Sequence, residues 1–203
     1  MVDTDDAKMP AQLILVTGTP CVGKTSVARL LASRLEGLHV DLTALALNEK
    51  RILARDRRRH TGVIDEDSMR SRIREITEGC EKNAIILDGH YGVHVAPKEQ
   101  TAHVFVLRRN PEQLRLLMEQ RGFSGRKLWE NLAAEILDVC LVEAINVYGE
   151  DKVCELDVSD KTVEDAVQDI LNIMDGSADC QRGFTDWLGK LEESGILEEY
   201  LKI

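Results

Sequence analysis

The stretch Gly18-Thr19-Pro20-Cys21-Val22-Gly23-Lys24-Thr25 decides the fold, because it fits the pattern G-x-x-x-x-G-K-[ST]. A continuous apolar run, 12–17, precedes it and predicts a strand that is buried on both faces. Apolar residues at helical spacing follow it, up to Gly37, which is expected to end that helix. A strand, a glycine-rich loop and a helix in this order predict a P-loop, in which backbone N–H groups surround phosphate oxygens.

Two side chains of this loop have specific expected roles. Lys24 is expected to reach the β- and γ-phosphates of a nucleoside triphosphate. The Thr25 hydroxyl is expected to bind the magnesium ion that accompanies the triphosphate. The loop therefore predicts ATP-type ligands with Mg²⁺, and a chemistry of phosphoryl transfer or hydrolysis.

Strands and helices alternate along the rest of the chain. Further strands are expected at 38–42, 84–87, 103–107 and 153–158. Helices are expected at 69–80, at 110–122 and, as one long helix, at 129–144. Another helix is expected to begin at a capping box formed by Thr162 and Asp165. The segment 43–64 is expected to be partly helical. This alternation predicts an α/β fold with a five-stranded parallel sheet and helices on both faces.

The 203 residues suit one domain with a small appendage. We expect a disordered lead at 1–11, a nucleotide-binding domain at 12–175 and a helical extension at 176–203. Apolar residues at helical spacing in the extension favour either a helix docked on the domain or an arm that binds a partner.

The composition indicates the cellular compartment and the state of the cysteines. No apolar run approaches the about 18 residues that cross a bilayer, and the acidic N-terminus does not resemble a signal peptide, so we expect a cytoplasmic protein without a membrane partner. Five widely spaced cysteines without a Cys-x-x-Cys pair favour reduced thiols over a disulfide framework or a zinc site.

The net charge of −10 disfavours nonspecific binding of nucleic acid by the whole surface. Residues 50–60 are the exception, because cations outnumber the single acid Asp56 there. This basic segment favours an anion site, with a solvated helix face as the alternative.

Asp88 ends the apolar run at 84–87, and His90 follows two residues later. An acid at the end of a buried strand is what a P-loop fold uses near magnesium and its waters. Asp88 is therefore a candidate metal-site residue, and His90 a candidate for orienting water or contacting the γ-phosphate.

Cations gather after the fourth expected strand. They are Arg108, Arg109, Arg121, Arg126 and Lys127. Arginines that close over a transferring phosphoryl group stabilise its charge, and two glycines in 121–127 permit movement. A mobile lid at about 120–130 is therefore predicted, with Arg121 as its leading catalytic candidate and solvated helix ends as the alternative.

Together these residues resemble the atypical adenylate kinases that also act as ATPases in maturation of the small ribosomal subunit. The matching stretches are Thr17-Gly18-Thr19-Pro20, Gly23-Lys24-Thr25, Ile64-Asp65-Glu66-Asp67, Asp88-x-His90, Val104-Phe105-Val106-Leu107-Arg108, Arg121-Gly122-Phe123, Lys127-Leu128, Glu130-Asn131 and Glu135-Ile136. They follow the family order over about 12–175.

The resemblance implies an activity and a set of site residues. The activity is ATP plus AMP giving two ADP, together with ATP hydrolysis, and Asp88 and His90 are expected to take part in hydrolysis or transfer. ATP contacts are expected from Gly18, Cys21, Val22, Gly23, Lys24, Thr25, Ser26 and Arg121. Contacts to the monophosphate are expected from Asp41, Arg51 and Arg55, in a segment at about 41–64.

The resemblance also implies partners. Transient binding to a small-subunit ribosomal protein of the S-eleven family is expected, with hydrolysis breaking the contact, and contact with pre-ribosomal RNA would accompany it. Kinase and assembly factor are compatible hypotheses, and a kinase of a non-nucleotide small molecule is the third. The chain departs from the family at Cys21, where glycine is usual, and the stretches 55–59 and 176–203 do not match the family pattern.

Overall fold

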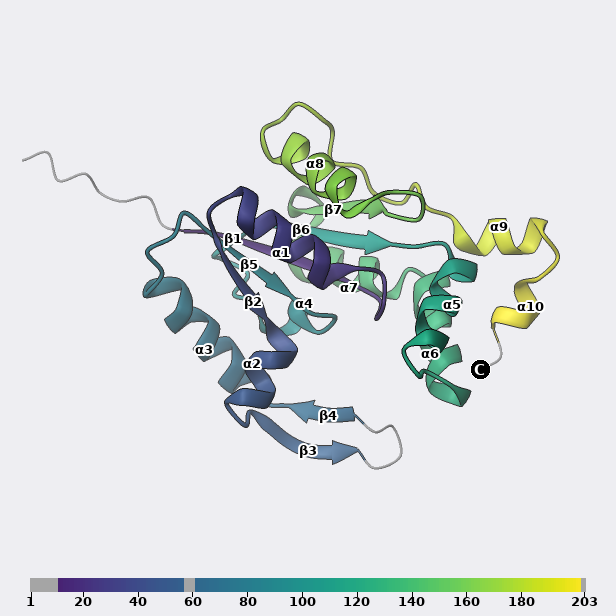
Figure 1. Ribbon diagram of the computed structural model, residues 1–203, viewed down its shortest axis with the longest axis horizontal. Coiled ribbons are helices and arrows are strands. Elements are labelled where there is room, and N and C mark those ends of the chain that lie inside the picture. The colour runs from purple at the N-terminus through teal and green to yellow at the C-terminus, as the bar shows by residue number, and fades with distance from the viewer. Residues whose placement is uncertain (1–10, 57–60, 202–203) are drawn as a thin grey trace, which may run out of the picture.

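Five parallel strands form the centre of the structure, a computed structural model that describes residues 11–56 and 61–201 (Figure 1). Within 52–56 and 61–63 it describes the backbone alone. In sheet order the strands are β2 (Leu38–Asp41), β5 (Ala84–Asp88), β1 (Gln12–Gly18), β6 (Thr101–Arg108) and β7 (Val153–Asp157). All neighbouring pairs are parallel, so the predicted α/β class with a five-stranded parallel sheet is confirmed.

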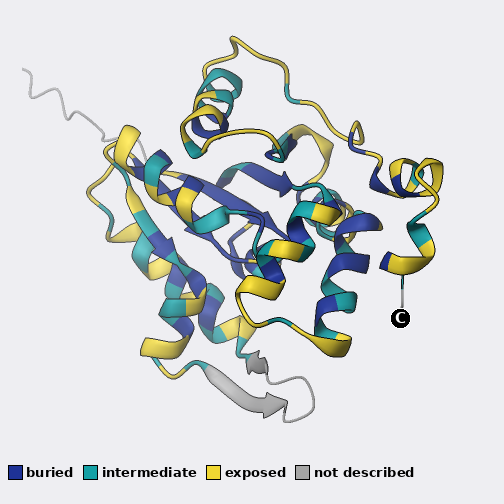
Figure 2. Ribbon diagram, turned by 45° about the vertical axis from the view of Figure 1, so that its right-hand side comes forward, coloured by how far each residue is buried: buried dark blue, intermediate teal, exposed yellow. Residues whose placement is uncertain are grey.

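Alternate residues of the central strands β5, β1 and β6 enter two separate hydrophobic cores. Ile14 and Val16 of β1 lie in one core, and Leu13 and Leu15 lie in the other, all fully buried. Because successive side chains of a strand point to opposite faces, an uninterrupted apolar strand requires cover on both sides of the sheet. Figure 2 shows the result, with buried strands between helices whose outer surfaces are exposed.

The helices divide between the two faces according to the core that their side chains enter. One core receives α1 (Lys24–Arg34), α5 (Pro111–Gln120), α6 (Gly125–Ile136), α8 (Val163–Met174), α9 (Trp187–Glu193) and α10 (Leu197–Tyr200). The other receives α2 (Leu42–Asn48), α3 (Glu66–Glu78), α4 (Gly92–Val95) and α7 (Val139–Tyr148). A 3₁₀ turn, Glu150–Lys152, precedes β7. The predicted capping box of Thr162 and Asp165 begins α8.

The register of the strands brings the ends that carry polar residues to one edge of the sheet. Val16 of β1 lies opposite Asp88 of β5, and Asp41 of β2 also lies opposite Asp88. In open α/β sheets, ligands bind at the carboxyl ends of the strands. This edge is therefore where the glycine-rich loop and the acids predicted to act with it meet.

One expectation about secondary structure is wrong, and another is incomplete. The segment 43–64, expected to be partly helical, contains the helix α2 and then an antiparallel hairpin of β3 (Ile52–Asp56) and β4 (Thr61–Ile64), which was not predicted. The long helix expected at 129–144 is two helices, α6 and α7. They separate at Asp138, whose φ of +55° is left-handed and whose carboxylate accepts a hydrogen bond from Arg108.

The expectation of reduced thiols is also wrong for two cysteines. Cys154 of β7 and Cys180 of the C-terminal extension form a disulfide, while Cys21, Cys80 and Cys140 are free. The extension runs beside β7, where Glu155 N–H donates to the carbonyl of Gln181 at 2.9 Å. This backbone pairing brings together two cysteines that are 26 residues apart, a proximity that spacing alone does not reveal.

The extension packs against the rest of the protein. Trp187 of α9 and Tyr200 of α10 are buried in the core that contains α1 and α8. The lead predicted at 1–11 lies outside the described residues except for Ala11. Across the described ranges, no helix is long and apolar enough to cross a membrane.

Candidate active site

The loop between β1 and α1 has the backbone conformation of a phosphate cradle. Gly18 has φ of +132°, and a Cβ there would lie 2.4 Å from the carbonyl oxygen of Leu107. Gly23 has φ of +114° and is the N-cap of α1. Val22 is fully buried and fixes the loop to the core. Both glycines are therefore required by the backbone path, which presents the first turn of α1 at the edge of the sheet.

The Lys24 ammonium lies inside this loop. Its Nζ donates to the carbonyl oxygens of Gly18 and Thr19, each at 2.8 Å. Burial lowers the pKa of Lys24, while nearby Cys140 and Asp88 act in the opposite direction. Two neutral carbonyls stabilise an ammonium less than phosphate oxygens do, so a triphosphate competes well for this cation. Thr25 and Ser26 follow in the first turn of α1, with Ser26 exposed.

Cys21 occupies the loop in a conformation that favours glycine. Its φ is +72°, in the left-handed region. Burial raises the pKa of the Cys21 thiol, and the charge and hydrogen bonding of Arg121 act against that rise. Arg121, which follows α5, therefore lies beside the loop.

The backbone of Cys21 allows a controlled prediction about stability. Cys21→Gly and Cys21→Ala both remove the thiol contacts, but only glycine relieves the left-handed conformation. We expect Cys21→Gly to be more stable than Cys21→Ala by about 1 kcal/mol in urea denaturation. Equal stability of the two variants would contradict the strain.

Asp88 provides an unpaired carboxylate oxygen at the edge of the sheet. The residue is 2 % exposed, and its Oδ2 lies 3.4 Å from Nε2 of His39. Within the described part of the chain, neither atom has a hydrogen-bond partner of good geometry, and the Tyr91 hydroxyl has none either. Mg²⁺ prefers oxygen ligands and retains several waters, so an accepting carboxylate oxygen beside a P-loop fits its requirements. The residues present therefore fit magnesium.

His90 follows this acid by two residues and lies near the loop and the lid. Desolvation by surrounding protein, together with the charges of Lys24 and Lys127, lowers the pKa of His90 to about 4, although the side chain still reaches solvent. The imidazole is therefore neutral at neutral pH, with a nitrogen lone pair that can accept a proton.

The predicted lid is the short turn between α5 and α6. Gly122 has φ of +81° and Gly125 has φ of +56°, and a Cβ at either would meet no atom within 4 Å. The Lys127 ammonium lies 5.1 Å from the centre of the Phe123 ring. Arg126 instead pairs with Glu130 at 2.7 Å on the surface. Of the lid cations, Arg121 and Lys127 are thus placed near the loop and His90.

Arg108 does not belong with these cations, contrary to the sequence-based expectation. It is 1 % exposed and donates to Glu135, Glu155 and Asp138. Although burial disfavours its charge, the carboxylates of Glu135 and Asp138 raise the pKa of Arg108. Arg108 therefore supports the fold beneath the site.

Arg109 has a related supporting position. Its Nε donates to the carbonyl oxygen of Val22 at 3.3 Å, and its Nη1 to Gln113 at 3.2 Å. The guanidinium thus braces the glycine-rich loop from the side. A contact with phosphate, which the sequence suggested, would compete with these bonds.

The residues assigned to the monophosphate are only partly brought to the loop. Asp41 is the N-cap of α2 and accepts from the backbone N–H of Ala44 at 2.9 Å. Arg51 donates to Glu49 at 2.8 Å and also to Ser68, so its guanidinium is already engaged. Arg55 lies on β3, but its side chain is outside the described structure, as are residues 57–60.

Sequence reasoning gave no role to three polar residues of this region. They are Thr19, His39 and Glu135. His39 lies on β2 next to β5, and Thr19 donates to Glu135 at 2.5 Å. Two signals were available in the sequence. His39 stands in a predicted strand that leads to the site, and Glu135 stands among apolar residues of a predicted helix.

Comparison with known proteins agrees with this geometry. A family model described as an AAA domain matches residues 14–138. The protein named "Putative adenylate kinase" of Methanocaldococcus jannaschii is 36 % identical over 91 % of this chain and 98 % of the relative. A protein of the same name from Pyrococcus furiosus is 36 % identical over 89 % of this chain and 94 % of the relative.

The chain belongs to this adenylate kinase family. The fold of this family member also resembles that of a solved shikimate kinase from Acinetobacter baumannii in complex with shikimate. The TM-score is 0.59 at 17 % identity, over 82 % of this chain and 94 % of the other. That likeness concerns the fold alone, which is the fold of a P-loop kinase.

Proposed function

We propose that this member of the adenylate kinase family transfers the γ-phosphoryl group of ATP to AMP, giving two ADP, and also hydrolyses ATP. The observation that carries the proposal is that two distant segments, the end of β5 and the lid, lie beside the P-loop. Thr17 Oγ1 donates to the carbonyl oxygen of Gly89, between Asp88 and His90, at 3.2 Å, and Arg121 lies near enough to Cys21 for its charge to act on the pKa of that thiol. The names of the relatives support a nucleotide as the acceptor.

The roles of the donor-site residues follow from charge and position. Backbone N–H groups of the loop between Cys21 and Ser26 hold the phosphates of ATP, helped by the N-terminus of α1. Lys24 exchanges its two carbonyl partners for the β- and γ-phosphates. Arg121 stabilises the charge that develops on the transferring group.

Magnesium bound with ATP supplies positive charge that neutralises the phosphate oxygens. The Thr25 hydroxyl and Asp88, the latter through bound water, are the residues that would hold it. Nε2 of His39 lies 3.4 Å from Oδ2 of Asp88, at ion-pair distance from that oxygen.

The acceptor site is proposed at 41–64, with Asp41, Arg51 and Arg55. Arg51 pairs with Glu49, which also accepts from Arg72 at 2.9 Å. Acceptor binding through Arg51 therefore requires that the phosphate replace Glu49 as the partner of its guanidinium.

The neutral imidazole of His90 suits the hydrolytic reaction. We propose that it orients a water molecule and accepts its proton in the absence of an acceptor. His90→Ala is expected to slow ATP hydrolysis about a hundredfold while leaving ATP affinity within about twofold. Phosphate release and calorimetric titration measure the two quantities. His94→Ala is the matched control, because His94 is exposed and faces Glu143 at 3.9 Å. An equal loss of affinity in His90→Ala would assign it a structural role.

The experiment that tests the proposed function measures phosphate release and nucleotide products in parallel, with and without AMP. We expect ADP to form from both ATP and AMP, and a slower phosphate release without AMP. ADP formation that does not respond to AMP, with no AMP consumed, would rule out the kinase activity. In that case, other nucleoside monophosphates would be screened as acceptors. If none of them were phosphorylated, the result would favour the alternative, a kinase of a non-nucleotide small molecule.

A cellular role in late maturation of the small ribosomal subunit and its rRNA is also proposed, on the family resemblance of the Asp88-x-His90 motif and the lid. The expected partner is a small-subunit ribosomal protein of the S-eleven family, released on ATP hydrolysis, with pre-ribosomal RNA nearby. The test is binding of that purified protein with and without ATP. No binding in either condition would contradict the proposal.

A further inference from the structure

Glu135 of α6 connects the P-loop to the C-terminal extension. The residue is 1 % exposed. Its carboxylate accepts from Thr19 Oγ1 at 2.5 Å, Arg108 Nε at 2.9 Å, the backbone N–H of Arg109 at 3.0 Å and Trp187 Nε1 at 3.3 Å. One buried carboxylate thus bonds directly to a residue of the glycine-rich loop and to a residue of the extension.

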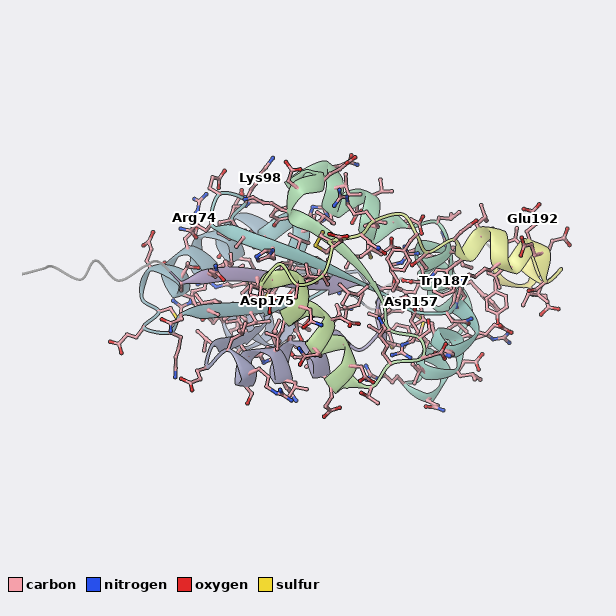
Figure 3. The ribbon with its side chains drawn as sticks, turned by 90° about the horizontal axis from the view of Figure 1, so that it is seen from above. Arg74, Lys98, Asp157, Asp175, Trp187 and Glu192 are labelled. Carbon is pink, nitrogen blue, oxygen red and sulfur yellow. A yellow bond between two sulfur atoms is a disulfide. The ribbon has the colours of Figure 1, made fainter. Side chains whose placement is uncertain are left out.

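Trp187 reaches this carboxylate from the start of α9. Its side chain is buried, and the helix that carries it is capped by Asp186. Figure 3 shows Trp187 where α9, in yellow, meets the body of the protein. A buried indole N–H requires an acceptor, and the carboxylate of Glu135 supplies a charged one.

The extension is also tied to β7 at a second place. Cys180 is bonded to Cys154, and the backbone N–H of Phe184 donates to Glu155 Oε2 at 3.2 Å. The other oxygen of Glu155 accepts from Arg108 at 2.7 Å. The tether therefore ends in the same buried ion-pair network that contains Glu135, only three residues before Trp187.

We propose that Trp187, held in place by the tether to β7, is a positioning residue for ATP binding. It acts through Glu135, whose second oxygen orients the Thr19 hydroxyl and with it the loop that follows Gly18. The inference rests on the proposed binding of ATP by this loop. It gives the extension a defined task, which is to keep the loop in the conformation that receives phosphates.

The expected effect is on ATP binding more than on turnover. Trp187→Phe keeps an aromatic ring but removes the indole N–H, while Arg108 and the backbone N–H of Arg109 still bond to Glu135, so we expect the fold to be retained. A hydrogen bond of this kind contributes modestly, and we expect ATP affinity to fall about three- to tenfold. The KM for ATP should rise by the same factor, with kcat at saturating ATP and the KM for AMP unchanged.

The experiment is a double-mutant cycle on ATP affinity, with Thr19→Val, Trp187→Phe and the double variant, measured by calorimetric titration. Because both residues act on Glu135, we expect the double variant to lose clearly less affinity than the product of the two single losses. Leu188→Ala, an exposed neighbour on α9, is the control and should bind ATP as the wild type does. Independent effects, or no effect of Trp187→Phe, would overturn the inference.

Two further measurements separate the possible failures. If the wild-type protein does not bind Mg–ATP, the proposed function fails before the cycle begins. If Trp187→Phe does not fold, Cys180→Ser replaces it, because that substitution releases the tether without touching Glu135. A weaker ATP affinity in Cys180→Ser, with Cys80→Ser unchanged, is the expected result, and unchanged affinity in Cys180→Ser would overturn the inference.

Discussion

Lys24→Ala is expected to reduce both phosphoryl transfer and ATP hydrolysis by about a thousandfold, to background. The lysine supplies the cation for the β- and γ-phosphates, and removal of one charge-stabilising donor in a preorganised site costs roughly two to three orders of magnitude in kcat. The substitution also removes the two bonds from Nζ to the carbonyls of Gly18 and Thr19. Loss of loop order adds to the loss of charge.

The measurement is a steady-state assay of ADP formation and phosphate release on the same preparations. Lys161→Ala is the matched control, since Lys161 pairs with Asp169 at 2.7 Å on the surface, away from the loop. It should retain wild-type activity. Near-native turnover of Lys24→Ala would contradict the assignment of this loop as the catalytic site.

Arg108→Met is expected to lower the free energy of unfolding by about 3–5 kcal/mol. Arg108 is enclosed by Glu135, Glu155 and Asp138, and its removal leaves two fully buried carboxylates without their cation. The cost of a buried unpaired charge greatly exceeds the gain from the added methionine side chain.

Urea denaturation measures this change. Arg126→Met provides the comparison, because Arg126 pairs with Glu130 but its side chain is 82 % exposed, so little change in stability is expected. If both variants lost similar stability, the buried network would not be a structural centre of the protein. A loss confined to Arg108→Met would also explain why this residue cannot serve as a mobile lid cation.

The sequence predicted most of the fold because its main signals are local. The apolar run of β1, the glycines of the loop and the caps of α5 and α8 each act within a few residues. The hairpin β3–β4 was missed because the cations at 50–59 conceal any strand alternation. The break between α6 and α7 was missed because apolar spacing continues through Asp138.

The same distinction applies to the candidate site. Lys24, Asp88, His90 and Arg121 were predicted from motif and position. The partners that hold the site in place were not, since Thr19 and Glu135 are 116 residues apart and meet only in the folded chain. Arg108 and Arg121 look alike in sequence, yet one is buried among carboxylates and the other lies beside the loop.

The sequence by itself determined a phosphate-binding loop between a buried strand and a helix, because backbone conformation there depends on which residues are glycine and where apolar side chains recur. Tertiary structure alone decided which of several arginines face the site. It also decided that Cys154 meets Cys180 and that Trp187 donates to Glu135, the carboxylate that accepts from Thr19 of the loop. Those outcomes depend on charge burial and on the proximity of distant segments, and neither quantity exists before the chain has folded.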